Sequence, residues 1–432
     1  MSYVVTQTGQ CGNQLGQCFF DLLSDVVKNQ SSANSSFSDE TFNRFFIDAE
    51  DKIFARSVLF DTEPKVIEEI SKPFKGRSWF YRDDGAVRVH DLGSGNNWAM
   101  GYHCYGPTAQ DAALNAVRKE MERCDHLISL LQLSSVAGGT GSGFGSYLSQ
   151  LFRDEFSTKS STNIIMWPFH KCDVTIQAYN SILSLSSFQE SSDAIFLFEN
   201  DWLMKLCRQK LRIKSSSLQD LNKVASLQLA HVLLPIGNNL NFSFTFNDTL
   251  AHLVPHPQFK LVGFRSVPQE PSASLPFSAH TWPGLLQSLK RMILYNTAID
   301  EVYGPHSSSS DPVSRPPVSL ANLLILRGRE CETAKPDIFS AIPYTSWVPS
   351  SMRLKSVTCG FPFLQYDKTA VLANNGQMSY SCVDLSMGRA WRMFSHKAYF
   401  HHYEQCGLTS DDFKQSAMTV EQIIASYKSL HV

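Results

Sequence analysis

The sequence predicts an α/β protein in which helices cover a parallel sheet. Two observations support this fold class. Short β-branched or apolar runs alternate with segments whose apolar residues recur at helical spacing, and the runs end in polar or glycine-rich turns. The chain has 432 residues, of which 43% are hydrophobic and 18% are charged. This length suggests two or three domains and allows a large core that needs no disulfides or metal ions.

The first predicted unit is a strand, a polar loop and a helix. The strand begins with Tyr3 to Val5, and the turn residues Gly9 to Asn13 form the loop. Apolar residues then recur from Leu15 to Val26 at the spacing of an amphipathic helix. The stretch Ser31 to Ser38 is rich in serine, and we expect a surface loop there.

Four further strands are expected in the first half of the chain. Each is a compact apolar run that leads into polar or turn residues. They are Ser57 to Phe60, Leu127 to Leu133, Asn163 to Trp167, and Ala194 to Phe198. Because ligands of open α/β sheets bind at the carboxyl ends of strands, the turns after these runs are candidate site residues.

The second half begins with a long predicted helix, Ser217 to Leu233, which could join two domains. Two segments rich in proline or serine, Val267 to Pro283 and Gly304 to Pro317, are expected to be loops and candidate contact surfaces. After Gly376 the pattern becomes helical again, and a last helix is expected from about Thr419 to Leu430. We find no internal repeat.

Charge, hydropathy and cysteine usage exclude several classes of protein. The 38 Lys and Arg nearly balance the 40 Asp and Glu, so we expect neither nucleic acid nor an anionic membrane as a partner. No apolar run approaches the roughly 18 residues that span a bilayer, and the start does not resemble a signal peptide, which favours a cytosolic protein. The ten cysteines include no CxxC pair, so a metal or redox motif is not supported.

A glycine-rich loop between a predicted strand and helix is the first candidate site. Its residues are Ala137, Gly138, Gly139, Thr140, Gly141, Ser142 and Gly143. Glycine lets backbone N–H groups crowd around an anion, and a helix N-terminus adds positive charge, so the loop suits phosphate. The alternative is a turn that needs glycine only for tight packing. No lysine follows the last glycine, which excludes a Walker A loop, and Ser146 leaves the dinucleotide fingerprint incomplete.

Two more loops offer backbone amides of the same kind. Gly93 to Trp98 is a short Gly/Asn loop, and Gly9 to Gly12 lies where the first strand ends and the first helix starts. Three such loops together favour phosphate binding over three unrelated turns.

These motifs resemble the tubulin superfamily. Gly9 to Gln14, Asp61 to Pro64, Gly95 to Ala99 and Gly138 to Gly143 occur in the order and spacing of that family. Later landmarks also match over essentially the whole chain, among them Asp220 to Asn222 and Leu253 to Pro257. The segments Ser192 to Ala194, Glu199 to Asp201 and His252 to Pro257 are most similar to the delta branch. The epsilon branch is second, because its long middle insertion is absent.

The resemblance implies a tubulin-type GTPase fold with three parts. Residues 1–201 would form the GTP-binding domain with the parallel sheet. Residues 202–375 would form a second α/β domain with a central helix and a hydrolysis loop. Residues 376–432 would form a C-terminal helical hairpin without the acidic tail of alpha and beta chains.

The resemblance also implies GTP or GDP and Mg²⁺ as cofactors. The residues expected at the phosphates are Gly95, Asn96, Ser135, Gly138, Gly139, Thr140 and Gly141. Those expected elsewhere are Gln10 and Cys11 toward the phosphate and base, Asp61 and Glu63 at Mg²⁺ partly through water, Asp173 at the ribose, and Asn200 and Asn222 at the guanine edge. A cap or turn is the alternative role for each Asn or Asp taken alone.

Three positions depart from the family pattern. Leu218 stands where an aromatic ring usually stacks on the base, and Gln177 replaces a ribose-side glutamate. Asp248 stands where alpha chains present a glutamate to the nucleotide of the next subunit. An aspartate could orient water there, and the alternative is that Asp248 caps a helix starting near Thr249. Whether the chain hydrolyses GTP stays open.

The resemblance implies assembly with other tubulins, namely epsilon, alpha or beta chains, and with centriolar microtubules. It places the protein in the cytoplasm, in the cytoskeleton, at the centrosome and at the basal body of cilia, with a role in forming or keeping triplet microtubules. A non-polymerising nucleotide-binding adaptor with the same fold is the alternative. A dinucleotide-dependent enzyme is disfavoured, because neither the fingerprint nor a catalytic dyad is present.

Overall fold

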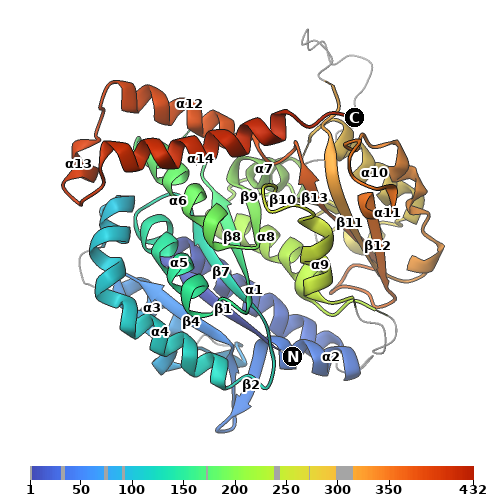
Figure 1. Ribbon diagram of the computed structural model, residues 1–432. Helices are drawn as coiled ribbons and strands as arrows, with labels where there is room; N and C mark the ends of the chain where they lie inside the picture. The colour runs from blue at the N-terminus through green and yellow to red at the C-terminus, as the bar shows by residue number, and fades with distance from the viewer. Residues whose placement is uncertain are drawn as a thin grey trace.

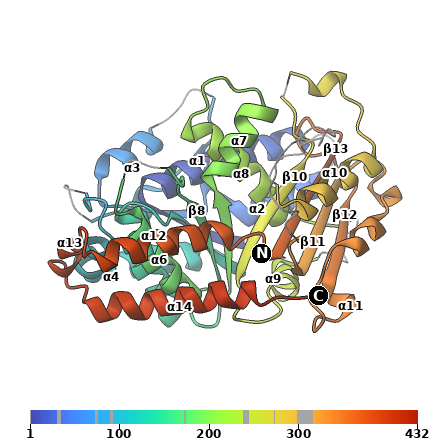
Figure 2. The same ribbon diagram turned by 90° about the horizontal axis from the view of Figure 1, so that it is seen from above.

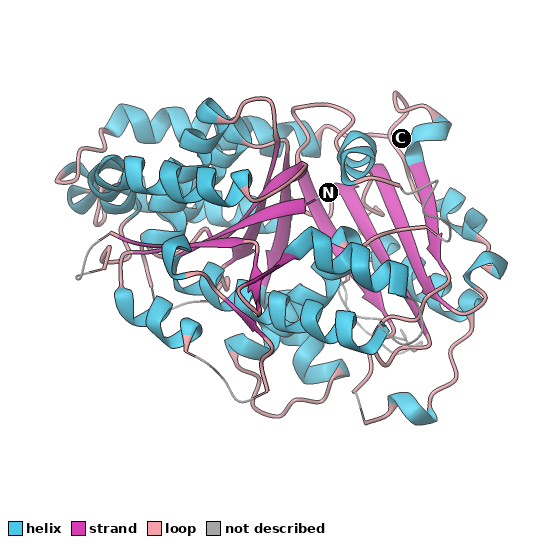
Figure 3. Cartoon of the chain, turned by 90° about the horizontal axis from the view of Figure 1, so that it is seen from below, coloured by secondary structure: helices cyan, strands magenta, loops and turns pink. Residues whose placement is uncertain are grey.

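A ten-stranded sheet runs through the molecule and carries helices on both faces (Figure 1). The computed structural model describes residues 2–30, 35–72, 76–89, 93–171, 174–237, 244–271, 273–297 and 315–432. The strand order is β12-β11-β13-β10-β9-β8-β7-β1-β4-β6. The predicted α/β class with a mostly parallel sheet is therefore confirmed, and Figure 3 shows the strands as one twisted layer between helices.

The sheet consists of β1 (Ser2–Thr8), β4 (Ser57–Asp61), β6 (Ala86–Arg88), β7 (Leu127–Ser135), β8 (Ser160–Trp167), β9 (Ala194–Glu199), β10 (Leu261–Val267), β11 (Ser319–Gly328), β12 (Leu354–Cys359) and β13 (Lys368–Gly376). Neighbours from β6 to β10 are parallel, whereas β13 runs antiparallel to β10 and β11. A small second sheet joins β2 (Phe46–Ala49), β3 (Lys52–Ala55) and β5 (Trp79–Phe80). Because the parallel strands point the same way, their carboxyl ends share one edge.

One face of the sheet is covered by α1 (Gly9–Gln30), α2 (Ser35–Phe45), α3 (Pro64–Ser71), α8 (Leu218–Leu233) and α9 (Phe246–Leu253). The other face is covered by α4 (Gly106–Glu122), α5 (Gly145–Glu155), α6 (Gln177–Ser191), α10 (Trp282–Leu294), α12 (Ser381–Ser395) and α14 (Ser410–Lys428). Among the short helices, α7 (Asn200–Lys205) contacts α8, α11 (Ser350–Arg353) contacts β11 and β12, and α13 (His401–Glu404) lies between α12 and α14 in the chain.

The central strands are apolar on both sides because both faces are covered. In β8, Ile164 and Met166 pack against the helices of one face, whereas Ile165 and Trp167 pack against those of the other. Successive side chains of a strand point to opposite faces, so a near-continuous apolar run is the pattern expected of a strand buried on both sides.

The C-terminal segment folds back over the face of the sheet that α6 covers. Helices α12 and α14 lie side by side across α6, and α13 forms the turn between them (Figure 2). The predicted C-terminal helical hairpin is thus present. None of the helices in the described parts of the chain is both long and apolar enough to cross a bilayer.

Several element ends differ from the prediction. Helix α1 begins at Gly9 rather than after Asn13, and Ser35 to Ser38 of the expected serine loop is helical. Helix α14 begins at Ser410, well before Thr419, because Thr409 and Asp412 form a capping box there. Of the expected loop Gly304 to Pro317, only its last three residues are described.

Candidate functional site

Three of the predicted loops meet at the carboxyl edge of the parallel strands. Gly9 follows β1 with φ +73°, and a Cβ atom added to it would lie 2.7 Å from the amide nitrogen of Gly141. An L side chain would therefore be strained by the backbone and blocked by the neighbouring loop. The start of α1 and the glycine loop after β7 are thus in direct contact.

A cluster of three hydroxyl groups joins further loops at the same place. The Oγ1 atoms of Thr62 and Thr140 are 2.6 Å apart, and Ser94 Oγ lies 2.9 Å from Thr140 Oγ1. Thr62 follows β4, Thr140 follows β7, and Ser94 belongs to the Gly93 loop. Thr140 therefore lies at the point where the loops converge, as its predicted role at the phosphates requires.

The glycines of these loops serve two different purposes. A Cβ at Gly143 would lie 2.0 Å from the carbonyl oxygen of Trp98, so this glycine allows tight packing. Gly138 has φ +73° and Gly95 has φ +57°, but a Cβ at Gly138 would meet nothing closer than 3.7 Å, and one at Gly95 nothing within 4 Å. The loops are packed on their inner side and open at Gly95 and Gly138, as a phosphate cradle would be.

The remaining predicted phosphate residues lie in or next to the same loops. Asn96 is exposed with φ 55°, beside Gly138, and Ser135 Oγ accepts a hydrogen bond from the Ala137 amide at 3.2 Å. Gln10 is exposed in the first turn of α1. Burial raises the pKa of the neighbouring Cys11 thiol to about 12, so it is a neutral group and not a thiolate nucleophile.

The two predicted Mg²⁺ residues follow β4. Asp61 is buried, and its carboxylate accepts hydrogen bonds from the Glu63 amide and from Asn13 Nδ2, both at 3.1 Å. Burial raises the pKa of Asp61 to about 6, against the effect of these two bonds. The Oδ1 atom of Asn13 is buried without a hydrogen-bond partner among the described residues.

This donor set suits Mg²⁺ only in combination with phosphate. The oxygens of Asp61, Glu63 and Asn13 are the hard ligands that Mg²⁺ prefers. The described residues contain no group of three or more His, Cys, Asp or Glu that could hold a metal ion alone. Mg²⁺ is commonly bound by one or two carboxylates, waters and substrate phosphates, so the residues fit the ion together with a nucleotide.

The predicted base and ribose residues lie on α6, α7 and α8. Asn200 begins α7, and its Oδ1 atom is buried without a partner in the described part of the chain. Asn222 is buried in α8, which packs against α7, and Leu218 begins α8 with 57% of its surface exposed. Gln177 is buried and donates to the Phe169 carbonyl at 2.9 Å. Asp173 lies outside the described residues.

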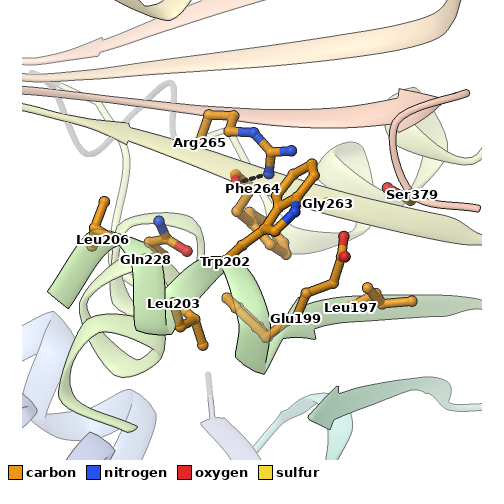
Figure 4. Close-up of a pocket in the computed structure, with 11 residues that line it drawn as sticks. Leu197, Glu199, Trp202, Leu203, Leu206, Gln228, Gly263, Phe264, Arg265 and Ser379 are labelled. Atoms are coloured by element: carbon orange, nitrogen blue, oxygen red, sulfur yellow. Dashed lines mark hydrogen bonds between the residues drawn. The ribbon is translucent and has the colours of Figure 1, made fainter. Parts of the chain in front are cut away.

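Beside Asn200, the end of β9 carries a partly buried acid, Glu199. Glu199, Trp202 and Arg265 line a cavity of about 30 Å³, which has room for about one or two waters (Figure 4). The Arg265 guanidinium lies 3.8 Å from the centre of the Trp202 ring and donates to the Thr297 and Phe264 carbonyls. Burial raises the pKa of Glu199 to about 7, and the positive charge of Arg265 opposes that rise.

We expect Glu199→Gln to flatten the pH dependence of stability. A carboxyl group that titrates near 4.3 when unfolded and near 7 when folded makes the folded state bind more protons between these values. The free energy of unfolding of the unmodified chain should therefore fall as pH rises from about 4.5 to 7. The free energy of unfolding of Glu199→Gln should exceed that of the unmodified chain by most above pH 7. Urea unfolding at several pH values measures this, with the exposed Glu404→Gln as control. Parallel curves for Glu199→Gln and the unmodified chain would contradict it.

Asp248 lies away from all these residues, at the opposite edge of the sheet. Helix α9 leads into the start of β10, and Asn247 contacts Ser160, the first residue of β8. Asp248 is exposed and forms a capping box, in which its Oδ2 accepts from Thr245 N at 2.9 Å and from Thr245 Oγ1 at 2.6 Å. These bonds lower the pKa of Asp248. The capping role is therefore present, with the helix starting at Phe246, and within one chain Asp248 does not meet the glycine loops.

The structure adds site residues that the sequence reasoning did not assign. Thr62 lies in the Asp61 to Pro64 motif and Ser94 in the Gly93 to Trp98 loop, so both hydroxyl groups could have been predicted from the sequence. Asn180 carried no such signal, because its position in α6 fits the helical pattern like its neighbours. Its side chain donates to the carbonyls of Asn96 at 2.7 Å and Gly138 at 2.8 Å.

Comparison with known proteins identifies the GTPase part of the chain. The sequence profile of the Tubulin/FtsZ family, GTPase domain, matches residues 2–208. This range contains the strands β1 to β9 and all of the glycine loops described above. The tubulin-type GTPase fold that the sequence motifs implied is thereby confirmed.

Full-length relatives place the chain within this family. It is 38% identical to the tubulin delta chains of Mus musculus and Homo sapiens, and each alignment covers 100% of both proteins. It is 29% identical to the tubulin gamma chain of Eremothecium gossypii and 27% identical to the tubulin beta chain of Cicer arietinum, over 98% of this chain and 91% and 93% of theirs. The chain therefore belongs to the tubulin family, in its delta branch.

Proposed function

We propose that this chain is a GTP-binding tubulin that acts in forming or keeping the triplet microtubules of centrioles and basal bodies. Membership in a GTPase family implies GTP or GDP binding. The observation that supports the binding site is the opening at Gly95 and Gly138, where positive-φ glycines leave free space beside the Thr62–Thr140–Ser94 hydroxyl cluster. Membership in the delta branch supports the centriolar and ciliary role.

In this proposal the loops, the two acids after β4 and the base-side residues have separate roles. The loops at Gly95 and Gly138 surround the phosphates, and Asp61 and Glu63 hold Mg²⁺, which would neutralise phosphate charge when bound. Asn200 and Asn222 read the guanine edge, and Asp173 contacts the ribose. Ionised phosphates are favoured at helix N-termini, and α1 and α5 both begin at these loops.

We further propose that assembly joins the two edges of the sheet. The phosphate loops lie at the carboxyl edge of the parallel strands, whereas Asp248 lies at the amino edge. Stacking one subunit on the next, head to tail, would bring Asp248 of one to the nucleotide of the other. The partner would be another tubulin, of the epsilon, alpha or beta type.

Bound nucleotide is the direct test of the site. We expect purified protein, denatured in perchloric acid and analysed by ion-exchange chromatography, to release about one guanine nucleotide per chain. Protein without nucleotide that also fails to bind added GTP in the presence of Mg²⁺ would contradict the proposal. The cellular role is tested separately, by removing the protein from ciliated cells and counting triplet and doublet microtubules in sectioned centrioles.

A non-polymerising nucleotide-binding adaptor is the second candidate. It is favoured by Leu218, whose exposed aliphatic side chain stands where an aromatic would stack on the base, and by Asp248, whose carboxylate is engaged in a helix cap. Sedimentation with microtubules separates the two functions. A chain that joins the polymer supports the first, and one that binds nucleotide yet stays in the supernatant at all concentrations supports the adaptor.

A further inference from the structure

A buried amide connects the two glycine loops to the C-terminal helices. The Nδ2 group of Asn180 donates to the carbonyls of Asn96 and Gly138, at 2.7 and 2.8 Å. Its Oδ1 atom accepts from the Trp98 amide at 3.1 Å and from the Tyr403 hydroxyl at 2.6 Å. Asn180 and Tyr403 are both fully buried. One side chain thus uses both donor hydrogens and two acceptor positions to hold three separate segments.

We propose that Asn180 is a positioning residue for nucleotide binding and that Tyr403 couples the phosphate loops to the C-terminal helices. The proposal rests on the proposed nucleotide site. Gly138 and Asn96 border its open side, so their backbone positions set the size of the cradle. Losing the two N–H donors would leave two carbonyls without these partners and free the loops to separate.

The coupling depends on how firmly Tyr403 is held. Its ring packs edge-on against Tyr179 at 5.4 Å and parallel to Phe400 at 6.2 Å. A second asparagine supports the same link, because Asn97 Nδ2 donates to the His402 carbonyl at 2.9 Å. Movement of α13 would therefore shift both glycine loops. By thermodynamic linkage, a nucleotide that fixes these loops would in turn stabilise α13.

The fold contains a matched control for this arrangement. Asn375 Nδ2 donates to the carbonyls of Leu253 and Phe259, both at 2.7 Å, and its Oδ1 accepts from the Tyr427 hydroxyl at 2.9 Å. Asn375 and Tyr427 are fully buried as well. This pair has the same chemistry and burial but contacts no glycine loop. Replacing it reproduces the stability cost without touching the proposed site.

The test compares Asn180→Asp and Tyr403→Phe with Asn375→Asp and Tyr427→Phe in the full-length chain. Aspartate keeps the shape but has at most one donor, the O–H of its protonated form, so it cannot hold both carbonyls, and phenylalanine removes only the hydroxyl. We expect Asn180→Asp to weaken GTP binding at least about tenfold and Tyr403→Phe by a smaller factor, with the control variants unchanged. Hydrogen exchange of the α13 amides should slow when GTP is added to the unmodified chain, and Tyr403→Phe should lose this protection.

Equal losses of GTP affinity in the two pairs, or no effect of GTP on α13 exchange, would overturn the proposal. Tyr403→Phe keeps the ring and supplies a milder variant if Asn180→Asp does not fold. Failure of the nucleotide site itself is seen on the unmodified chain, as absence of GTP binding. The positioning role of Asn180 is then tested by hydrogen exchange without nucleotide. Amides of residues 138–143 should exchange faster in Asn180→Asp than in Asn375→Asp, and equal rates would overturn this role.

Discussion

We expect Asp248→Ala to bind GTP as tightly as the unmodified chain and to lose about a hundredfold of its assembly-dependent GTP turnover. Asp248 is exposed at the edge of the sheet opposite the phosphate loops, so it can act only on the nucleotide of a neighbouring subunit. Hydrogen bonds from Thr245 lower the pKa of its carboxyl group, which keeps it ionised and able to orient a water. Phosphate release per chain, measured as protein concentration is raised, should rise for the unmodified chain and stay low for the variant.

The capping role of Asp248 must be separated from a role in turnover. Asp412 offers the matched control, because its Oδ2 accepts from Thr409 N at 2.9 Å and Thr409 Oγ1 at 2.7 Å, in the same capping box. Losing either box should cost about 1 kcal/mol of stability. Only Asp248→Ala should lose turnover. Equal loss in Asp412→Ala would assign Asp248 a structural role, and no turnover by the unmodified chain at any concentration would favour the adaptor.

The order of strands and helices could be predicted from the sequence because both faces of the sheet are covered. A strand such as β9 then has apolar residues at every position from Ala194 to Phe198, and a helix such as α8 shows apolar residues at helical spacing. Helix starts were predicted less well. The beginnings of α9 and α14 depend on Thr245 with Asp248 and on Thr409 with Asp412, a Thr-x-x-Asp pattern that the sequence contains. The prediction took Asp248 itself as the cap of a helix near Thr249 and began the last helix at about Thr419, so it placed both starts too late.

The candidate site was predictable where glycine motifs define it and not where packing does. Gly138 and Gly95 have positive φ, which is why glycine stands there, and the motif is visible in the sequence. Asn180 acts through contacts with residues far away in the chain, up to Tyr403, and helical spacing carries no information on such contacts. The same holds for Glu199, whose pKa is raised by burial in a cavity that Trp202 also lines, against the opposing charge of Arg265.

The second large effect is expected at Asn200, at the proposed guanine edge. We expect Asn200→Ala to weaken GTP binding by about 10- to 100-fold and to abolish the preference for GTP over ITP, which lacks the 2-amino group. Asn200 Oδ1 is a buried acceptor with no partner among the described residues, so the guanine N–H groups would supply the missing donors. Competition of GTP and ITP against a fluorescent guanine nucleotide measures both changes.

The stability of Asn200→Ala without nucleotide distinguishes the loss of a guanine contact from a weakened fold. Removing a buried oxygen that has no partner deletes an unfavourable group, so Asn200→Ala without nucleotide should unfold at no lower urea concentration than the unmodified chain. Asn163 is the matched control: its Oδ1 is also buried without a partner in the described structure, but its Nδ2 donates to Ser149 within the fold. Asn163→Ala should therefore lose stability and keep the affinity for GTP. A loss of GTP affinity in Asn163→Ala as large as in Asn200→Ala would show that the effect comes from a weakened fold, and an unchanged GTP/ITP ratio in Asn200→Ala would remove Asn200 from the guanine edge.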